Sequence, residues 1–330
     1  MLKALIIGLG SIGRRHLQIL AQMDDGKIIC CRSGKGRVVP GFDAKHGVKT
    51  VNNLNQAIAE KPDFAIIANP TSLHVETALS LASAGIPFLI EKPVSDRLEG
   101  LDSLQRTVSE QSIPVMVSFQ LRHHPGYKQL LQMINSGEIG KPLSLQGYVG
   151  QYLPEWRPNE DYRQSYSAKK DLGGGVILDL CHEIDIAISI LGNVNKVSCL
   201  CDHYSDLQIE TEDMADITME HTSKTLSHVH LNYLERGYEW VTKVMGTLGT
   251  VIWDYRRGYV KIIRADSTSR RWNDPNGFER DWLFREQLKQ WLEVLDGKTV
   301  PAVNLVEGIA VTKVALAAKR SSQEKRHIEV

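Results

Sequence analysis

Three glycines directly after an apolar run at the amino terminus constrain the fold of this chain more than any other feature. The segment GLGSIGRRH follows the strand-like run KALII and places Gly8, Gly10 and Gly13 where a helix is expected to begin. Such glycines allow a tight turn, a close approach of the backbone to a pyrophosphate and close packing of helix on strand. The motif predicts a dinucleotide site that includes Ser11 and Ile12, and a purely structural glycine turn is the alternative.

Short apolar runs alternate with helical patterns up to residue 121. The expected strands show no polar alternation, which is typical of a parallel sheet covered on both faces. They are KALII, KIICCR, DFAIIANP, PFLIEKP and PVMVSFQ. Helical spacing over residues 72–84 ends at Gly85, a common helix stop. Strand and helix repeated in this way predict an α/β domain over residues 1–121 with a doubly wound parallel sheet.

The rhythm changes after Gln120. A helix is expected near residues 127–136, then the strand LSLQGYVGQYL, a polar aromatic loop, and one helix through GGGVILDLCHEIDIAISILG. Alternation in LSHVHLNYL indicates a strand with one apolar and one polar face. Helices over 280–296 and 303–321 close the chain. We predict for residues 122–330 an α+β domain that binds substrate and forms oligomers, with an open, mostly antiparallel sheet and a C-terminal helix that packs back on the first domain.

The composition excludes some classes of partner. The chain has 330 residues, which suggests two domains at roughly 150 residues per domain. Its 39 basic and 39 acidic residues balance, so no overall field attracts nucleic acid or an anionic membrane. No signal peptide and no apolar stretch of roughly 18 residues is evident, so we expect a cytoplasmic protein. The five cysteines lack C-x-x-C spacing, which favours reduced core thiols.

The end of the second expected strand bears on the choice of cofactor. Strands at this position usually end in Asp or Glu, which hydrogen-bonds the ribose hydroxyls of NAD and repels the extra phosphate of NADP. Here the strand ends in Cys31, Arg32 and Ser33. Arg32 and Ser33, with Lys35 or Arg37, offer charge and hydrogen bonds to that phosphate. We predict NADP as the preferred cofactor; the alternative is NAD held by the backbone beside a solvated basic turn.

A lysine stands at the carboxyl end of the expected strand PFLIEKP, in the sequence Glu91, Lys92, Pro93. Ligands of open α/β sheets lie outside the carboxyl ends of the strands, so Lys92 is aimed at the ligand crevice. Its ammonium can hold a substrate oxygen and stabilise the charge that develops when an alcohol loses its proton. A solvated loop lysine is the alternative.

A histidine between two aspartates lies on the expected helix near residue 180. Offsets of three and six residues place Asp179, His182 and Asp185 within about 120° around a helix, so that they can face one pocket. A carboxylate beside a histidine orients the imidazole and stabilises its protonated form, which suits acid–base chemistry. A buried histidine satisfied by one aspartate is the alternative.

Taken together, these motifs resemble the Gfo/Idh/MocA oxidoreductase family, the glucose-fructose oxidoreductase and inositol dehydrogenase group. The resemblance spans the whole chain and rests on the glycine start, Asn69 and Pro70 after the fourth strand, EKP after the fifth, LRHHP after the sixth, and the GGG to HEID helix. It implies an amino-terminal Rossmann domain and a second domain whose open sheet often makes oligomer contacts. It also implies NAD(P)-dependent oxidation or reduction at a carbinol or carbonyl carbon of a sugar, sugar derivative or cyclitol.

The resemblance implies roles for individual residues. Lys92 matches the family's active-site lysine, His182 the proton acceptor, and Asp179 the aspartate that binds a substrate hydroxyl or steadies the imidazole. The common family spacing is D-x-x-x-H, whereas this chain has D-x-x-H, which leaves open whether Asp179 or Asp185 supports His182. Residues expected by position at the cofactor are Asn69, Pro70, His74, Glu91, Lys92 and Arg122, and His124 is expected at the substrate.

The loop YLPEWRPNEDYRQSY is the expected substrate-recognition segment. Trp156, Arg157, Tyr162 and Arg163 combine stacking surfaces with guanidinium donors, which suit a sugar bearing phosphate or carboxylate. An aromatic-rich interface loop is the alternative. The loop, together with LCHEID, also resembles a branch of the family whose members often sit among bacterial genes for surface sugars.

We therefore predict an NAD(P)-dependent dehydrogenase or reductase that acts on CH–OH groups of a sugar, a cyclitol or a sugar derivative, including phosphorylated, carboxylated or nucleotide-linked ones. The alternatives are a non-catalytic sensor of the same fold and a reductase of a non-sugar carbonyl. We expect a homodimer or homotetramer formed through the C-terminal sheet, with no nucleic-acid partner, no membrane association and no metal. His228 and His230 alternate as on a wet sheet face.

Overall fold

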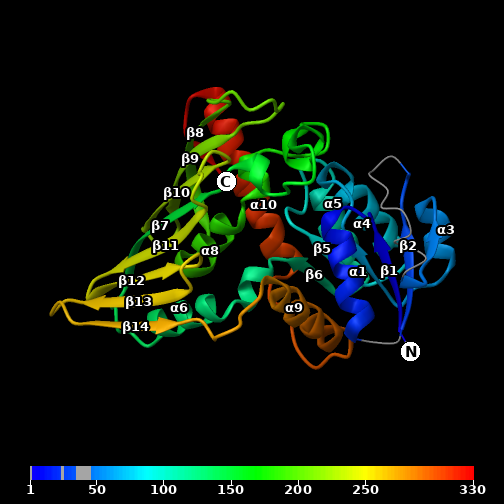
Figure 1. The fold of residues 1–330 in the computed structure, drawn as a ribbon, viewed down its shortest axis with the longest axis horizontal. Coiled ribbons are helices and arrows are strands. Elements are labelled where there is room, and N and C mark those ends of the chain that lie inside the picture. The colour runs from blue at the N-terminus through cyan, green and yellow to red at the C-terminus, as the bar shows by residue number, and fades with distance from the viewer. Residues whose placement is uncertain (1, 24–25, 35–45) are drawn as a thin grey trace. The chain divides into compact units, whose positions relative to one another are not determined.

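The structure is a computed structural model that describes residues 2–23, 26–34 and 46–330 of the chain. These residues form two compact units (Figure 1). The first unit is Met1–Gln120 with Glu279–Ile309, and the second is Leu121–Phe278 with Ala310–Val330. The tasks predicted for residues 1–121 and 122–330 stay predictions.

The first unit is a six-stranded parallel sheet with helices between its strands. Its order, β3-β2-β1-β4-β5-β6, is that of the doubly wound dinucleotide-binding folds. The strands are β1 (Lys3–Ile7), β2 (Lys27–Cys31), β3 (Lys49–Val51), β4 (Phe64–Ile67), β5 (Phe88–Glu91) and β6 (Val115–Ser118). The helices are α1 (Ser11–Met23), α3 (Leu54–Ala59), η1 (Thr71–Leu73), α4 (His74–Ser83), α5 (Leu101–Glu110) and α9 (Arg280–Leu295). The predicted doubly wound sheet is confirmed.

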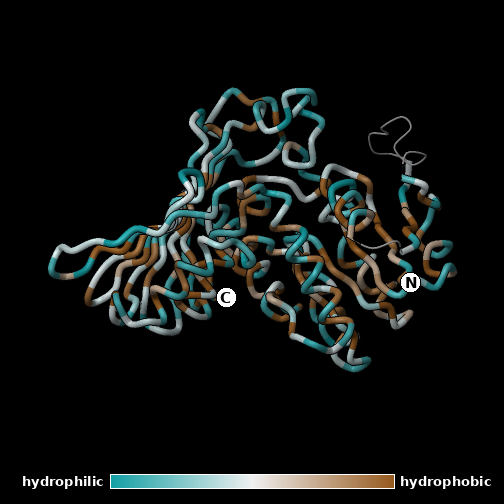
Figure 2. Tube along the Cα trace, turned by 60° about the horizontal axis from the view of Figure 1, so that its bottom comes forward, coloured by the Kyte–Doolittle hydropathy of each residue, from teal (hydrophilic) through white to brown (hydrophobic). Residues whose placement is uncertain are grey.

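The core of this unit lies on both faces of the sheet. Every residue of β4, β5 and β6 is buried, which explains why these strands show no polar alternation in the sequence. Trp291 of α9 is fully buried and packs edge-on against Phe64 of β4, with 6.3 Å between the ring centroids, which is within the usual range for such pairs. Hydrophobic (brown) segments accordingly gather along these strands (Figure 2).

The second unit is a nine-stranded sheet with helices against it. Its strands are β7 (Pro142–Gly150), β8 (Val194–Asp202), β9 (Met214–His221), β10 (Leu226–Asn232), β11 (Glu239–Gly246), β12 (Gly249–Asp254), β13 (Tyr259–Arg264), β14 (Ser269–Asn273) and β15 (Ile328–Glu329). Its helical segments are η2 (Gln120–His123), α6 (Pro125–Asn135), η3 (Leu153–Glu155), η4 (Tyr162–Gln164), η5 (Tyr166–Ala168), α7 (Val176–Asp179) and α8 (His182–Leu191). Helix α10 (Leu305–Glu324) begins in the first unit and ends in the second.

The large sheet has one apolar and one polar face, as the alternation predicts. Its order is β14-β13-β12-β11-β7-β10-β9-β8-β15, and of its pairs only β10 with β7 is parallel among the described strands. Val229 and Leu231 on β10 are fully buried, whereas His230 between them is partly exposed and His228 before them is exposed. Four of the five cysteines are buried and all are free thiols, in agreement with the expected core thiols. None of the helices in the described residues has the length and apolar character of a bilayer-spanning segment.

The predicted single helix through GGGVILDLCHEIDIAISILG is wrong. The structure has the short helix α7, which ends at Asp179, and a second helix, α8, which begins at His182. Leu180 and Cys181 leave the helical conformation between them, with ψ of 22° and 0°. The helical spacing of Asp179, His182 and Asp185 therefore does not apply across this break, and the three residues do not share the face of one helix.

Candidate functional site

The glycine turn between β1 and α1 is packed tightly at two positions and open at the third. Gly8 has φ of +90°, and a Cβ there would lie 2.5 Å from the backbone nitrogen of Asn69. A Cβ on Gly13 would lie 1.9 Å from the carbonyl oxygen of Gly8. At Gly10, in contrast, a Cβ would meet nothing within 4 Å. Two glycines thus hold the turn against the sheet, and the third leaves the backbone open to a ligand, as the pyrophosphate of a dinucleotide requires.

The start of α1 completes this cradle. Ser11 and Ile12 are its first two residues, so their N–H groups lie in the first turn, where the helix dipole favours an anion. Arg14 Nη1 donates to the carbonyl oxygen of Leu9 at 2.9 Å, which ties the side chain to the turn itself. The residues present therefore fit a dinucleotide by the space at Gly10 and by the donors beside it.

The end of β2 lies against the glycine turn. The Gly8 N–H donates to the Cys31 carbonyl at 2.9 Å, and the Arg32 N–H donates to the Val51 carbonyl at 3.1 Å. Ser33 is exposed. The strand end that normally carries an acidic residue thus carries Arg32 and Ser33 at the expected place, while Lys35 and Arg37 lie outside the described residues.

A buried network holds the Lys92 loop. Glu91 Oε1 accepts hydrogen bonds from His16 Nε2 of α1 and from Ser118 Oγ of β6, both at 2.7 Å. Burial alone would raise the pKa of Glu91, but the hydrogen bonds from His16 and Ser118 and the charge of Lys92 outweigh it, and the pKa is lowered. The ionised Glu91 thus connects the residue before Lys92 to helix α1 and strand β6 by hydrogen bonds. Lys92 is partly exposed and is joined to Pro93 by a cis peptide bond.

His74 links the loop after β4 to the loop after β5. Its Nδ1 lies 2.9 Å from the Pro93 carbonyl and its Nε2 lies 2.9 Å from the Asn69 carbonyl. Only a doubly protonated ring could donate to both, yet burial lowers the pKa of His74, so a neutral ring donates to one of them. Asn69 Nδ2 donates to Thr77 Oγ1 at 2.9 Å, and Pro70 precedes η1. The predicted cofactor residues Asn69, Pro70 and His74 thus lie together at the carboxyl edge of the sheet.

His182 begins α8 in the second unit and is 4% exposed. Its ring lies 5.8 Å from the Trp240 ring, tilted by 45°. The neighbouring Glu183, which the sequence reasoning passed over, is fully buried and accepts hydrogen bonds from Trp240 Nε1 at 2.5 Å and from Thr242 Oγ1 at 3.1 Å. Burial raises the pKa of Glu183 to about 7, although these hydrogen bonds act in the opposite direction.

The two aspartates of this segment have partners of their own. Asp179 Oδ2 accepts from Ser167 Oγ at 2.5 Å and from Tyr233 Oη at 3.3 Å. Asp185 accepts two hydrogen bonds from the guanidinium of Arg122, both at 2.8 Å. The support of the His182 imidazole by Asp179 or by Asp185 stays a prediction.

Arg122 and His124 occupy structural positions in the second unit. Besides its pair with Asp185, Arg122 donates to Tyr127 Oη at 3.0 Å. His124 is fully buried, accepts from the Gly126 N–H at 2.9 Å as the cap of α6, and has its pKa lowered to about 3 by burial. These positions favour structural roles, and the predicted contacts with cofactor and substrate stay predictions.

The aromatic loop is held at both ends by hydrogen bonds. Trp156 Nε1 donates to the Gln151 carbonyl at 3.0 Å, and its ring packs edge-on against Tyr233 at 5.3 Å. Tyr162 Oη accepts from the Gln208 N–H at 3.2 Å. Arg163 donates to both carboxylate oxygens of Asp161 and to the Gln208 side chain, while Arg157 is partly exposed. Tyr233 links this loop to Asp179, and the predicted recognition of substrate by the loop stays a prediction.

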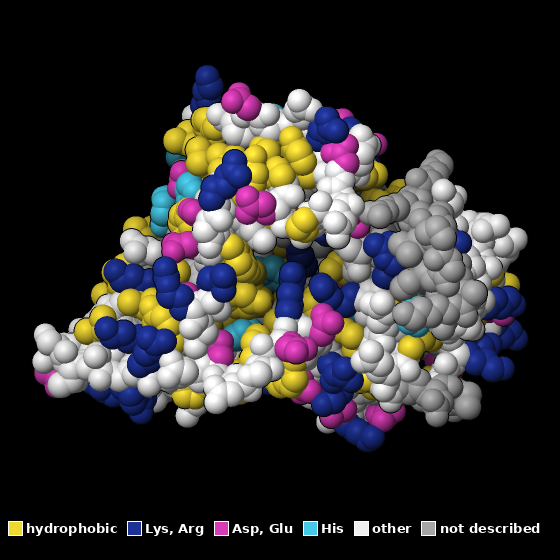
Figure 3. All heavy atoms as spheres, viewed as in Figure 1, with side chains coloured by type: hydrophobic (Ala, Val, Ile, Leu, Met, Phe, Trp, Pro, Cys, Tyr) yellow, Lys and Arg dark blue, Asp and Glu magenta, His cyan; other side chains and the backbone are white. Residues whose placement is uncertain are grey.

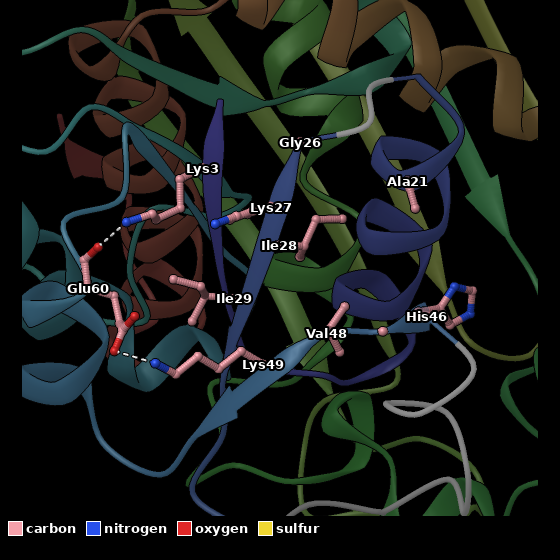
Figure 4. A pocket seen from close by; sticks show the side chains of 11 residues that line it. Lys3, Ala21, Gly26, Lys27, Ile28, Ile29, His46, Val48, Lys49 and Glu60 are labelled. Carbon is pink, nitrogen blue, oxygen red and sulfur yellow. Dashed lines mark hydrogen bonds and ion pairs between the residues drawn. The ribbon is translucent and has the colours of Figure 1, made fainter. Parts of the chain in front are cut away.

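A cavity of about 610 Å³ lies at the opposite edge of the first sheet (Figure 4). Its wall includes Lys3 and Lys27, at the amino ends of β1 and β2, and Lys3 and Lys49 both reach Glu60. Ligands of open α/β sheets bind at the carboxyl edge, and this wall contains none of the residues described above. We therefore do not assign the functional site to this cavity.

The described residues include no group of three or more His, Cys, Asp and Glu side chains placed to hold a metal ion. The alternating histidines of β10 have other contacts: His230 Nδ1 lies 2.9 Å from Asp216 Oδ1, and His228 Nδ1 lies 3.1 Å from Thr218 Oγ1.

The sequence reasoning missed three supporting residues. His16 lies in the glycine segment GLGSIGRRH, eight residues after Gly8, and Ser118 is the last residue of β6. Neither shows a signal in the sequence, because the fold and not the local pattern brings each of them to Glu91. Glu183 did carry a signal, since it stands beside the apolar residues Ile184 and Ile186, and a buried carboxylate needs a partner.

Models of two domains of one protein family match the chain. Residues 2–119 match the model of an oxidoreductase family with an NAD-binding Rossmann fold. Residues 127–252 match the model of the GFO/IDH/MocA C-terminal domain. The two matches together cover most of the chain and follow its two units.

Individual relatives are distant but align along most of their length. The chain is 24% identical to myo-inositol 2-dehydrogenase of Thermotoga maritima, over 98% of this chain and 97% of that protein. It is 27% identical to scyllo-inositol 2-dehydrogenase (NAD(+)) of Bacillus subtilis, over 80% of this chain and 77% of that protein. The solved structure of levoglucosan dehydrogenase in complex with NADH has the same fold, with a TM-score of 0.88 at 19% identity, over 100% of this chain and 99% of that chain.

Proposed function

The chain belongs to the GFO/IDH/MocA family of NAD-binding oxidoreductases, and from this premise we propose that it transfers a hydride between a nicotinamide cofactor and a CH–OH carbon of a sugar or cyclitol. The relatives named above are dehydrogenases of inositols and of levoglucosan, which supports this substrate class. Sugar derivatives that carry phosphate, carboxylate or a nucleotide belong to the same proposal because of the guanidinium groups in the aromatic loop.

The observation that carries the proposal is the pairing of two features at one edge of the first sheet. The glycine turn after β1 is open at Gly10, and the Lys92 loop after β5 is anchored to the helix of that same turn through Glu91 and His16. A structural glycine turn would need neither the open position nor an anchored lysine. A nicotinamide oxidoreductase needs both, a cradle for pyrophosphate and a fixed cation beside the reacting carbon.

The roles of the chain's own residues follow from their chemistry. Gly10, Ser11 and Ile12 bind the pyrophosphate, and the chemistry that a bound nicotinamide supplies is hydride transfer. His182 takes the proton of the substrate hydroxyl in the oxidative direction, and Lys92 stabilises the oxygen as that proton leaves. Asp179 binds a substrate hydroxyl through the carboxylate that Ser167 and Tyr233 hold in place.

The substrate class is tested by following NAD(P)H formation with myo-inositol, scyllo-inositol, levoglucosan and a set of sugar phosphates and sugar acids. We expect turnover with at least one polyol of this panel. Turnover only with non-sugar carbonyls would support a different reductase. A protein that binds NAD(P)H tightly but never changes its redox state with any of these compounds would support the sensor alternative.

We propose further that NADP is the preferred cofactor. The support is the end of β2, where Arg32 and Ser33 stand beside the glycine turn in place of an acidic residue. An acidic residue there would repel the 2′-phosphate, whereas Arg32 attracts it. The levoglucosan dehydrogenase structure contains NADH, which is a property of that protein.

Paired fluorescence titrations of cofactor-free protein with NADPH and NADH test this preference. We expect NADPH to bind at least about tenfold more tightly, a difference of about 1.4 kcal/mol. Arg32→Ala should remove most of that difference and leave NADH binding unchanged, because only the 2′-phosphate contact is lost. Equal or tighter binding of NADH by the unmodified protein would contradict the proposal.

We propose that the polar face of the large sheet joins two copies of the chain. Outward side chains on β9 include Asp216 and Glu220. Lys243 of β11 and Lys261 of β13 lie in register with each other on either side of β12. Figure 3 shows Lys and Arg side chains gathered over the region of β12 to β14. A two-fold axis near β10 would set the basic strands of one copy against the acidic strand of the other, as a self-complementary interface requires.

Light scattering on a size-exclusion column tests this interface. The unmodified chain should elute as a dimer or tetramer, and the double variant Lys243→Glu, Lys261→Glu should elute as a smaller species because like charges would then meet. Lys298→Glu changes an exposed lysine outside the large sheet and serves as the control. The same large species for the double variant and the control would contradict the proposed face.

A further inference from the structure

We propose that Glu183 is a positioning residue that fixes His182 through the indole of Trp240, an inference that rests on the proposed function. Trp240 is the shared contact: its N–H donates to Glu183 Oε1, and its ring lies 5.8 Å from the His182 ring. The two residues adjacent in sequence at the start of α8 are therefore connected a second time, through a side chain of β11.

The Glu183 carboxyl group is placed with little freedom. Trp240 Nε1 donates to Oε1, and Thr242 Oγ1 lies 3.1 Å from both oxygens, so its single hydrogen is available to Oε2. On the other side the carboxyl group packs on Gly147 of β7, where a Cβ would lie 2.3 Å from Oε2. The backbone of Gly147 has no positive φ, so the space taken by Glu183 is what requires glycine there.

Such a group is expensive to bury, which argues for a specific role. Its two donors are a neutral indole and a neutral hydroxyl, and Asp185 in the same helix adds a like charge. The guanidinium group of Arg122 binds Asp185 of the same helix. An apolar residue in the same place would avoid the desolvation of a carboxylate, so packing alone does not account for Glu183.

The geometry explains what the carboxyl group does. Helix α8 begins at His182, directly after the break at Leu180 and Cys181, and the first turn of a helix has fewer intrahelical hydrogen bonds than its interior. Glu183 ties this first turn to β11, and the indole clamped by Glu183 limits the rotation of the imidazole beside it. A misplacement of about 1 Å at a proton-transferring group can lower a rate by about 10²-fold, which sets the scale of the effect.

Three variants test the proposal: Glu183→Ala, Glu183→Gln and Trp240→Phe. Glutamine keeps an oxygen for the Trp240 N–H and an amide for the Thr242 hydroxyl, whereas phenylalanine keeps a ring beside His182 and removes the N–H donor. We expect Glu183→Ala to lower kcat by about tenfold or more with little change in KM for the cofactor, and Trp240→Phe to lower it less. Glu183→Gln should keep a kcat close to that of the unmodified protein.

A readout without substrate separates this proposal from the proposed function. In protein labelled with ¹³C at histidine, the Cε1–H signal of His182 is assigned by its loss in His182→Ala. We expect this signal to shift or broaden in Glu183→Ala and to keep its position in Glu183→Gln. A merely structural role would lower the melting temperature while leaving the signal and the kcat per cofactor-binding site unchanged.

The outcomes are distinct. If neither Glu183→Ala nor Trp240→Phe changes the His182 signal or kcat, Glu183 does not position His182, whatever the reaction is. If His182→Ala keeps full turnover, the proposed role of His182 as base is wrong, and the signal alone then decides whether Glu183 orients that ring. If Glu183→Ala does not fold, Trp240→Phe and Glu183→Gln still give either result.

Discussion

Replacing His182 by alanine is expected to lower turnover by about 10²- to 10⁴-fold, the usual contribution of a positioned proton acceptor. The side chain lies at the start of α8 with 4% of its surface exposed, so its removal takes away an acid–base group and only a small part of the core. Steady-state kinetics with a substrate from the polyol panel measure the loss, and titration with NAD(P)H should show unchanged cofactor affinity.

His221 provides the matched control for this variant. It is also a buried histidine of the second unit, with Nδ1 2.7 Å from the Gly192 carbonyl and Nε2 2.8 Å from Ser227 Oγ. His221→Ala should reduce stability, because it leaves two buried polar groups without their partner, and should spare kcat. Equal losses of kcat in both variants would show that His182 acts through the fold and not as a base.

Gly13→Ala is expected to lower the stability of the fold, whereas Gly10→Ala is expected to lower the affinity for the cofactor. The Cβ at residue 13 would lie 1.9 Å from the Gly8 carbonyl oxygen, which belongs to the backbone and cannot turn aside. Helix α1 must then shift, and we expect a loss of about 1–3 kcal/mol or more in the free energy of unfolding. Urea denaturation measures this loss.

Gly10→Ala should leave the fold intact and weaken the binding of the cofactor. Its Cβ meets nothing within 4 Å, so the free energy of unfolding should change by less than about 1 kcal/mol. The methyl group would occupy the space needed by the pyrophosphate, and NAD(P)H affinity should fall by about tenfold or more, or about 1.4 kcal/mol. Unchanged affinity in Gly10→Ala would show that the turn is only structural, and an unchanged unfolding energy in Gly13→Ala would contradict the close packing of α1.

The local residue pattern was enough to predict the doubly wound sheet of the first unit. The runs without polar alternation became the buried strands of a parallel sheet, and GLGSIG became the turn from β1 to α1. The alternation in LSHVHLNYL likewise predicted the two faces of β10. In each case a few neighbouring residues carry the information, because strand pleat and helix pitch give fixed periods.

The environment of the candidate base could not be predicted in the same way. The helical period predicted one helix over residues 173–192, whereas α7 ends at Asp179. The Asp179 carboxylate accepts hydrogen bonds from Ser167 and Tyr233. Asp185 proved to be bound to Arg122, which lies 63 positions earlier in the chain. A helical period describes which residues share a face only as long as the helix continues, and it holds no information on the partners that other elements bring.

The sequence by itself determined the doubly wound sheet, the glycine turn after its first strand, and the place of Lys92 directly after a strand. Only the tertiary structure decided that His16 and Ser118 hold Glu91, that Trp240 joins Glu183 to His182, and that His124 caps a helix inside the core. The physical reason is range: turns and periods depend on residues a few positions apart, whereas a buried polar group is satisfied by whichever donors the folded chain brings within hydrogen-bonding distance.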